Sequence, residues 1–324
     1  MRGRPMPNST QDGLINHVGA DGHVSAEDVI FLRRTVFADG VVSRDELATL
    51  FTLGRRAPAG DPEWADYFAE AASDFFLREE EPHGYLTEEE FQHLSSLTGR
   101  NGPTALELGL LVTLMEKAVA TPPAMAEFIA DEFRRTAGAH KGGPRITRAE
   151  AELLRRYLYA AGGDGAIAIT RAEAELLFDL HELTAGANND PAFSDLFIKG
   201  IAAHLMAHVG YKPLPREEAL RLHDWVRDQT VNPAGFFGRM VAGGLDAIRD
   251  AYGPKKTAAA RKNEDNAIAA AIAEQVTAQE ADWLADRIGR NGHFDAIERA
   301  LLTYMRGLEA DLPPRLAALV EKAA

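Results

Sequence analysis

The sequence predicts an all-α protein, and three observations support this fold class. An aliphatic residue, a Ser or Thr, two further residues and an acid occur in this order six times, beginning at Val24, Val42, Leu86, Ile146, Ile169 and Val276. The segments between these copies place apolar residues at the spacing of one buried helical face. No segment alternates apolar and polar residues for longer than two or three positions, as a half-buried strand would.

The repeated pattern is a signal for the start of a helix. The hydroxyl accepts hydrogen bonds from the N–H groups of the first turn, and the acid three residues later folds back onto the cap and interacts favourably with the helix dipole. We therefore predict helix starts at Ser25, Ser43, Thr87, Thr147, Thr170 and Thr277. Asp61-Pro62 and Asp190-Pro191 predict two further starts, because proline is favoured at the first helical position.

The chain also matches itself in a fixed order, which indicates an internal duplication. The matched pairs of segments are 24–39 with 146–161, 42–53 with 169–180, 61–77 with 190–206 and 87–102 with 277–292. Amphipathic helices predicted over 106–119 and 296–308 continue the match. We therefore predict two tandem, related helical lobes. Their organisation is a flexible N-terminus at 1–20, a first lobe at 21–138, a Gly/Pro-rich linker at 139–145, and a second lobe at 146–324 with a helical insert at about 213–275.

Composition limits the class of protein. The 324 residues are enough for two domains, and 46% hydrophobic with 26% charged residues is typical of a folded globular chain. A net charge of −14 argues against a nucleic-acid-binding surface, which needs a basic face. The absence of cysteine excludes disulfides and thiolate chemistry. The sequence begins without the apolar stretch of a signal peptide and contains no run long enough for a membrane span, so we expect a cytoplasmic protein, and the Ala/Arg/Gly-rich composition suggests a bacterial one.

Two segments have the spacing of a calcium-binding loop. Segments 35–46 and 79–90 each carry Gly at the sixth position, an aliphatic residue at the eighth and Glu at the twelfth. Asp-Gly pairs also precede helix starts at Asp21, Asp39 and Asp164. These features resemble the loops of EF-hand proteins and the short Asp-Gly pattern of TerB-like helical proteins. The resemblance implies helix–loop–helix units, loops that pair through their eighth positions, and calcium as the ligand.

The oxygen ligands depart from the EF-hand pattern. Phe37 stands at a ligand position of the first loop and cannot coordinate a cation, and Glu79 and Glu81 are longer than the usual Asp or Asn. The candidate calcium ligands are Thr35, Asp39, Ser43, Glu46, Glu79, Glu81, Thr87 and Glu90. In the alternative interpretation, Glu46 and Glu90 are the capping acids of two helices and the glycines supply positive-φ turns. We therefore expect degenerate loops without a cofactor, and a calcium site is the alternative.

Other candidate chemistry is sparse. His204 and His208 have the i, i+4 spacing of many zinc sites, although a buried or helix-end role is commoner for such histidines. The sequence contains no nucleophile elbow, no Gly-rich phosphate loop and no dinucleotide fingerprint. An enzyme is therefore the third and least supported function.

The insert is the most individual part of the chain. It carries an apolar stripe at helical spacing, formed by Phe236, Phe237, Met240, Val241, Leu245 and Ile248. Glycines interrupt this stripe, and the segment 254–262 after it holds four basic residues and no acid. The stripe either covers the duplicated core or docks onto a protein partner or, less plausibly, a membrane surface. The sequence thus predicts a non-enzymatic protein-interaction or scaffold protein, with a divalent-cation sensor as the alternative.

Overall fold

The computed structural model describes residues 18–99, 101–160, 169–208, 277–288, 290, 294–307 and 314–322. Its contacts divide the chain into two compact units, Met1–Glu132 (unit 1) and Phe133–Ala324 (unit 2). The division falls inside helix α7 (Pro123–Gly138), before the linker predicted at 139–145.

The all-α fold class is confirmed for the described residues. All the long elements there are helices, and the two strands, β1 (His23–Val24) and β2 (Ala59–Gly60), have two residues each and pair in parallel. None of the helices in this part of the chain is both long and apolar enough to cross a membrane.

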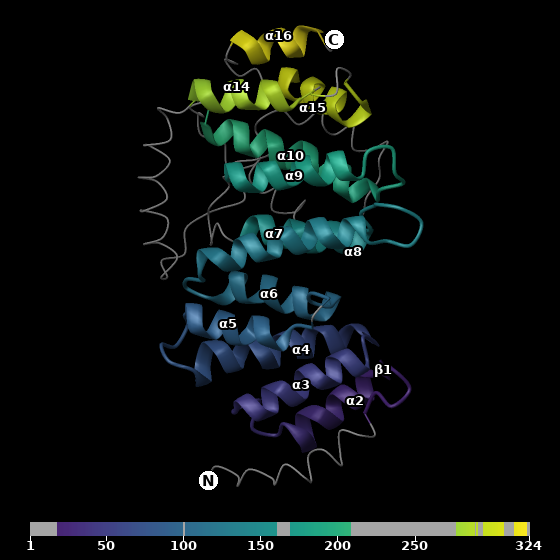
Figure 1. Cartoon of the computed structure of the whole chain (residues 1–324), viewed down its shortest axis with the longest axis vertical. Helices are drawn as coiled ribbons and strands as arrows, with labels where there is room; N and C mark the ends of the chain where they lie inside the picture. The colour runs from purple at the N-terminus through teal and green to yellow at the C-terminus, as the bar shows by residue number, and fades with distance from the viewer. Residues whose placement is uncertain are drawn as a thin grey trace, which may run out of the picture. The chain divides into compact units, whose positions relative to one another are not determined.

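Unit 1 follows a simple order of helices joined by short loops (Figure 1). Its helices are α2 (Ala26–Phe31), η1 (Leu32–Val36), α3 (Arg44–Arg56), α4 (Pro62–Asp74), η2 (Phe75–Glu79), α5 (Glu88–Leu97), α6 (Ala105–Lys117) and the first part of α7. The π-helical turns η1 and η2 continue α2 and α4 directly. Helix α6 ends two residues earlier than predicted, because Ala118 is extended and the N–H of Val119 donates to the carbonyl of Gly84 at 2.8 Å.

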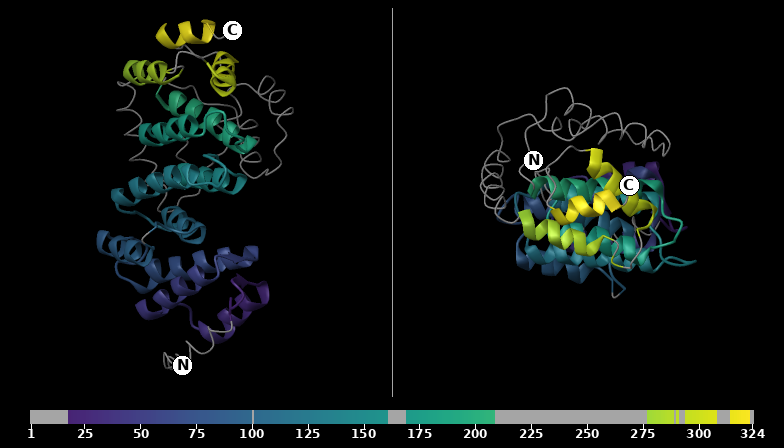
Figure 2. Two further views of the ribbon diagram at one scale, coloured as in Figure 1. Left: turned by 45° about the vertical axis from the view of Figure 1, so that its right-hand side comes forward. Right: turned by 90° about the horizontal axis from the view of Figure 1, so that it is seen from above.

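Helix α4 forms the centre of unit 1, where it packs against α2, α3 and α6 (Figure 2). Trp64 and Phe68 of α4 are buried, and the ring centroid of Phe68 lies 5.2 Å from that of Phe51 on α3. Gly54 permits this approach, because a Cβ atom there would lie 2.9 Å from the ring of Phe68. A close aromatic contact between α3 and α4 therefore lies in the core of unit 1.

Unit 2 begins with the last part of α7 and continues with further helices. They are α8 (Arg148–Ala160), α9 (Arg171–Leu183), α10 (Pro191–His208), α14 (Thr277–Arg287), α15 (Ala296–Gly307) and α16 (Pro314–Lys322). Helix α10 packs against α8, α9 and α15, and the rings of Phe178 on α9 and Phe197 on α10 are 5.1 Å apart. Both rings are buried.

The predicted helix starts are confirmed wherever their side chains are described. Ser25, Thr87, Thr147 and Thr170 each bond to the acid three residues later and accept from its backbone N–H. Ser43 also caps its helix, but the carboxylate of Glu46 accepts from the N–H of Val42 at 3.0 Å instead of from Ser43. Helix α14 begins at Thr277, whose side chain lies outside the described residues.

Two helices, predicted over 106–119 and 296–308, begin with caps of the same kind that the sequence analysis did not identify. Thr104 caps α6 through a capping box with Glu107, and Asp295 caps α15, with Glu298 bonding back to its N–H at 3.1 Å. Thr104 follows a proline rather than an aliphatic residue, and Asp295 supplies a carboxylate instead of a hydroxyl. The pattern that identified the other starts was therefore too narrow.

We expect Thr104→Ala to lower the free energy of unfolding of unit 1 by about 1 kcal/mol, the usual loss when a capping hydroxyl is removed. Urea-induced unfolding followed by circular dichroism measures it. Thr104→Ser, which retains the hydroxyl, should keep nearly the wild-type value. Equal losses for the two variants would contradict the capping role.

Three groups of predictions lie outside the described residues. They concern the N-terminus up to residue 17, the Asp164-Gly165 turn, and the insert at 213–275 with its apolar stripe.

Candidate functional site

Three loops of unit 1 meet at one end of its helices. The loop before α3 is joined to the loop before α5 by an ion pair between Arg44 and Glu80 at 2.9 Å. The loop before α5 is joined to the loop after α6 by a parallel bridge between Tyr85 and Ala120. We name this surface, formed by residues 37–45, 78–89 and 116–122, the loop face.

The candidate calcium ligands all lie in or beside the loop face, but they do not converge. Asp39, Ser43, Glu79 and Glu81 are exposed, Thr35 and Thr87 are partly buried, and Glu46 and Glu90 are buried. Across the described part of the chain, no group of three or more His, Cys, Asp or Glu side chains has a geometry that could hold a metal ion.

The structure shows the conformation of the two loop glycines and the bonding of the residues at the eighth positions, Val42 and Leu86. Gly40 and Gly84 adopt positive φ angles of 90° and 82°, so the predicted turns are confirmed. The EF-hand resemblance implies that the two loops pair through their eighth positions, Val42 and Leu86, but the backbone N–H groups of these residues bond elsewhere. The N–H of Leu86 donates to the carbonyl of Ala120 at 3.1 Å, while the N–H of Val42 donates to Glu46.

The two buried acids act in helix caps. One oxygen of Glu90 accepts from the N–H of Thr87 at 2.6 Å and from its hydroxyl at 2.7 Å. The other oxygen, Oε1, is buried and has no hydrogen-bond partner, and the same is true of Nε2 of His93 one turn later. Each of these atoms is a buried polar group for which the described residues provide no hydrogen bond.

The ion pair between Arg44 and Glu80 holds two loops together at the surface. The hydrogen bond from Arg44 lowers the pKa of Glu80, and the same bond raises the pKa of Arg44. The Arg44 side chain is 49% exposed, so solvent screens the pair and its contribution to stability is small. Its main effect is to fix the position of one loop beside the other.

Large apolar side chains are exposed on each of the three loops. The exposed fractions are 38% for Val42, 43% for Tyr85 and 44% for Val119. Tyr85 and Val119 come from loops whose backbones are bonded to each other, since Val119 donates to Gly84 and Leu86 donates to Ala120. Within the described residues only two other large apolar side chains, Ile30 and Leu183, are exposed to a similar degree.

Unit 2 contains a buried cation surrounded by acids. Arg287 of α14 is 9% exposed and makes ion pairs with three acids along one face of α9: Glu175 at 3.2 Å, Asp179 at 2.7 Å and Glu182 at 3.1 Å. Its guanidinium also stacks over the ring of Phe178 at 5.2 Å. This cluster holds α14 against α9, so its role is structural.

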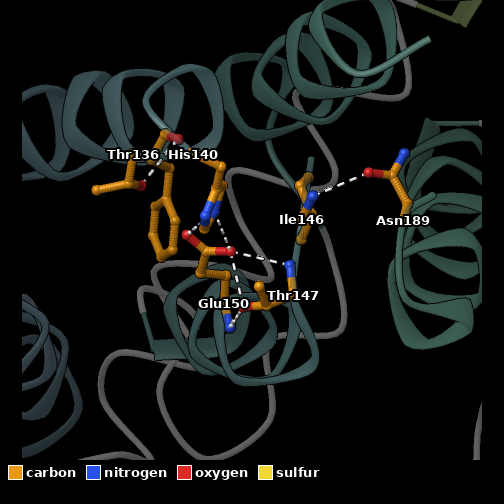
Figure 3. Close-up of polar contacts among 7 residues, drawn as sticks. Thr136, His140, Ile146, Thr147, Glu150 and Asn189 are labelled. Carbon is orange, nitrogen blue, oxygen red and sulfur yellow. Dashed lines mark hydrogen bonds and ion pairs between the residues drawn. The ribbon is translucent and has the colours of Figure 1, made fainter. Parts of the chain in front are cut away.

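A second polar cluster of unit 2 joins the segment after α7 to the start of α8 (Figure 3). Nε2 of His140 lies 2.9 Å from both carboxylate oxygens of Glu150, which also bonds to the hydroxyl of Thr147 at 2.7 Å. The N–H of Ile146 donates to Oδ1 of Asn189 at 2.8 Å. The predicted linker at 139–145 is thus tied to α8 by side-chain bonds.

His204 has the buried role that its spacing left open. It is fully buried, and its Nδ1 lies 2.7 Å from the carbonyl oxygen of Ile169. Its ring packs against Trp283 at 5.6 Å. The side chain of His208 lies outside the described residues.

Glu173, at the start of α9, has a pKa above the usual value for a glutamate. Burial raises its pKa to about 7, although the hydrogen bonds from Thr170 oppose this rise. The folded state therefore holds the proton more tightly than the unfolded chain. Its contribution to stability is complete below the ordinary glutamate pKa and is lost as the pH rises towards about 7.

We expect the difference in free energy of unfolding between wild type and Glu173→Gln to change by about 2 kcal/mol between pH 5 and pH 8, with the wild type becoming less stable relative to the variant. Urea-induced unfolding at both pH values measures this difference. A difference that stays constant over this range would show that Glu173 is ionised throughout.

Comparisons of the chain with protein families, with curated proteins and with solved structures find no match.

Proposed function

We propose that the chain is a non-enzymatic binding or scaffold protein built from two related helical units. Matching contacts support the relation. The N–H of Asp61 donates to the carbonyl of Val24 at 3.0 Å in unit 1, and the N–H of Asp190 donates to that of Ile146 at 2.9 Å in unit 2. The packing of α4 on α2, α3 and α6 has its counterpart in the packing of α10 on α8, α9 and α15.

The observation that carries the binding function is the exposure of Val42, Tyr85 and Val119 on three adjoining loops. Each of these side chains leaves apolar surface in water that a bound partner would cover. The buried acids of the same loops are used in helix caps, so the loops present apolar and acidic side chains outward.

Affinity capture from a lysate of the native host tests this function. We expect immobilised wild type and Ile30→Ser to retain the same partner and Tyr85→Ser/Val119→Ser to lose it. Ile30 is the matched control because it is 50% exposed on α2, outside the three segments that form the loop face. Circular dichroism melting verifies that the variants fold. Retention of the same proteins by all three forms, or of none, would contradict the proposal.

A second candidate function is divalent-cation binding, and the buried, unbonded Oε1 of Glu90 favours it. A buried oxygen without a partner is unfavourable, and a bound cation would satisfy it. Calorimetric titration with Ca²⁺ tests this function on the wild type and on Glu46→Gln/Glu90→Gln. A micromolar isotherm that disappears in the variant would establish it, and the absence of heat in the wild type would exclude it.

A further inference from the structure

We propose that Glu173 is the proton sensor of a pH-sensitive joint between α9 and α10. While the carboxyl group holds its proton, it caps α9 and the joint is closed. Loss of the proton opens the first turn of α9. This inference concerns a regulatory device inside unit 2 and goes beyond the proposed binding function.

The carboxyl group of Glu173 is buried at the start of a helix. The residue is 6% exposed, and its Oε2 accepts from the N–H of Thr170 at 2.7 Å and from the hydroxyl of Thr170 at 2.9 Å. A protonated carboxyl group keeps both bonds when Oε2 is its carbonyl oxygen. An ionised group at the same place is unfavourable unless a cation lies beside it, because a buried charge loses its hydration.

No cation pairs with this carboxyl group among the described residues. Arg134 of α7 and Arg287 of α14 both pair with Asp179, at 3.0 Å and 2.7 Å. Lys199 of α10 and Arg155 of α8 each pair with an acid of their own helix, at 3.0 Å and 2.9 Å. The cations of the neighbouring helices are therefore held by other acids.

The titratable groups nearest to the start of α9 do not supply a compensating charge either. Tyr157 of α8 has a raised pKa because it is buried and because the charge of Glu173 opposes its ionisation. Nδ1 of His204 on α10 lies 2.7 Å from the carbonyl oxygen of Ile169, and Arg171 of α9 itself stacks over the indole ring of α14 at 4.9 Å. None of these side chains forms an ion pair with the carboxyl group.

Two other capping acids of the chain have the partner that Glu173 lacks. Glu107, at the start of α6, pairs with Arg55 at 2.8 Å, and Glu150, at the start of α8, lies 2.9 Å from His140. Without such a partner, burial raises the pKa of Glu173 to about 7, although its own hydrogen bonds oppose the rise. The closed joint therefore keeps the proton up to neutral pH, and the stability that the proton provides is lost as the pH rises through about 7.

Loss of the proton acts on the contact between α9 and α10. The ionised carboxylate reaches water by turning away from Thr170, which removes the cap of the first turn. Ile169, directly before that cap, is held to α10 by its bond to the fully buried His204. Its side chain also packs closely there, since a Cβ atom at Gly200 would lie 3.2 Å from Cδ1 of Ile169. Opening of the first turn therefore loosens the joint between the two helices.

Hydrogen–deuterium exchange of the full chain at pH 6 and pH 8 measures this opening, after correction for the direct effect of pH on amide exchange. We expect the protection of segment 170–177 to fall about tenfold, because at pH 8 only about one carboxyl group in ten at Glu173 keeps its proton. Segment 104–111 is the internal control. Its protection should not change, because Arg55 compensates the charge of Glu107.

Matched variants separate the proton from other effects of pH. Glu173→Gln keeps an oxygen that accepts from Thr170 but cannot ionise, so segment 170–177 should be equally protected at pH 6 and pH 8. Glu107→Gln removes a capping acid from α6 and should leave the pH dependence of segment 170–177 as in the wild type. Unchanged protection of this segment in the wild type, or an equal fall in Glu173→Gln, would overturn the inference.

A titration of the wild type by NMR needs no variant. We expect the chemical shift of the carboxyl carbon of Glu173 to change with a midpoint near pH 7, and the protection of segment 170–177 to fall with the same midpoint. A midpoint near the usual glutamate pKa of 4.5, or protection that falls with a different midpoint, would overturn the inference. Neither result depends on the loop face, so the proposed binding function is tested separately.

Discussion

Replacing Phe68 by alanine is expected to lower the free energy of unfolding of unit 1 by about 3 to 5 kcal/mol. Removing a fully buried aromatic ring leaves a cavity and also eliminates the apolar contacts of the ring. The ring lies against Phe51, Trp64 and the surface of Gly54, so no neighbour can easily fill the space. Phe197→Ala should cause a similar loss in unit 2, where the ring contacts Phe178 at 5.1 Å. Urea-induced unfolding measures both losses.

The control for this prediction is Phe68→Leu, which retains most of the buried volume and should cost about 1 kcal/mol. The two units also allow an internal comparison, since each alanine variant should shift the unfolding of its own unit. A loss below about 1 kcal/mol for Phe68→Ala would show that α4 does not form the core described here.

Replacing Arg287 by methionine should destabilise unit 2 by about 3 kcal/mol. Three acids of α9 would lose their common cation, and breaking a buried ion pair usually costs about 3 to 5 kcal/mol. The lower end of that range applies because the three carboxylates are 35% to 48% exposed and partly screened by solvent. Chemical unfolding at low and high salt measures the effect, which should be smaller at high salt.

Arg315→Met is the matched control for Arg287→Met. Arg315 also pairs with two acids, Asp282 and Asp286, but its side chain is 57% exposed and solvent screens the pairs, so we expect no measurable change in stability. In Arg287→Met, Asp179 keeps its ion pair with Arg134 at 3.0 Å, so the loss falls mainly on Glu175 and Glu182. If Arg287→Met and Arg315→Met have the same effect, the cluster does not hold α14 against α9.

Many of the helix starts could be predicted because a helix start depends on neighbouring residues. A hydroxyl and an acid three residues apart bond to each other within one turn, so the pattern alone places the starts at Ser25, Thr87 and Thr170. The same locality explains the misses at Thr104 and Asp295. Each satisfies the chemistry of a cap, but the preceding residue or the capping group falls outside the pattern that was used.

The sites could be predicted only in part, because they depend on contacts between distant residues. The sequence indicated the acids Asp39, Glu79 and Glu81, and the structure confirms the turns beside them but places their side chains at the surface. The exposed group at Tyr85 and Val119 arises from loops on either side of α5 and α6. The ion pair between Arg287 and Asp179 joins residues 108 positions apart, beyond the reach of any local pattern.

Crystals of the protein grown with millimolar Ca²⁺ test most directly the central claim that the acids of the two loops begin helices. We predict that Glu46 still accepts from the N–H of Val42 and Glu90 still accepts from that of Thr87, with no ion in either loop. Carboxylates turned away from these N–H groups towards a calcium ion coordinated by residues 35–46 or 79–90 would contradict the account.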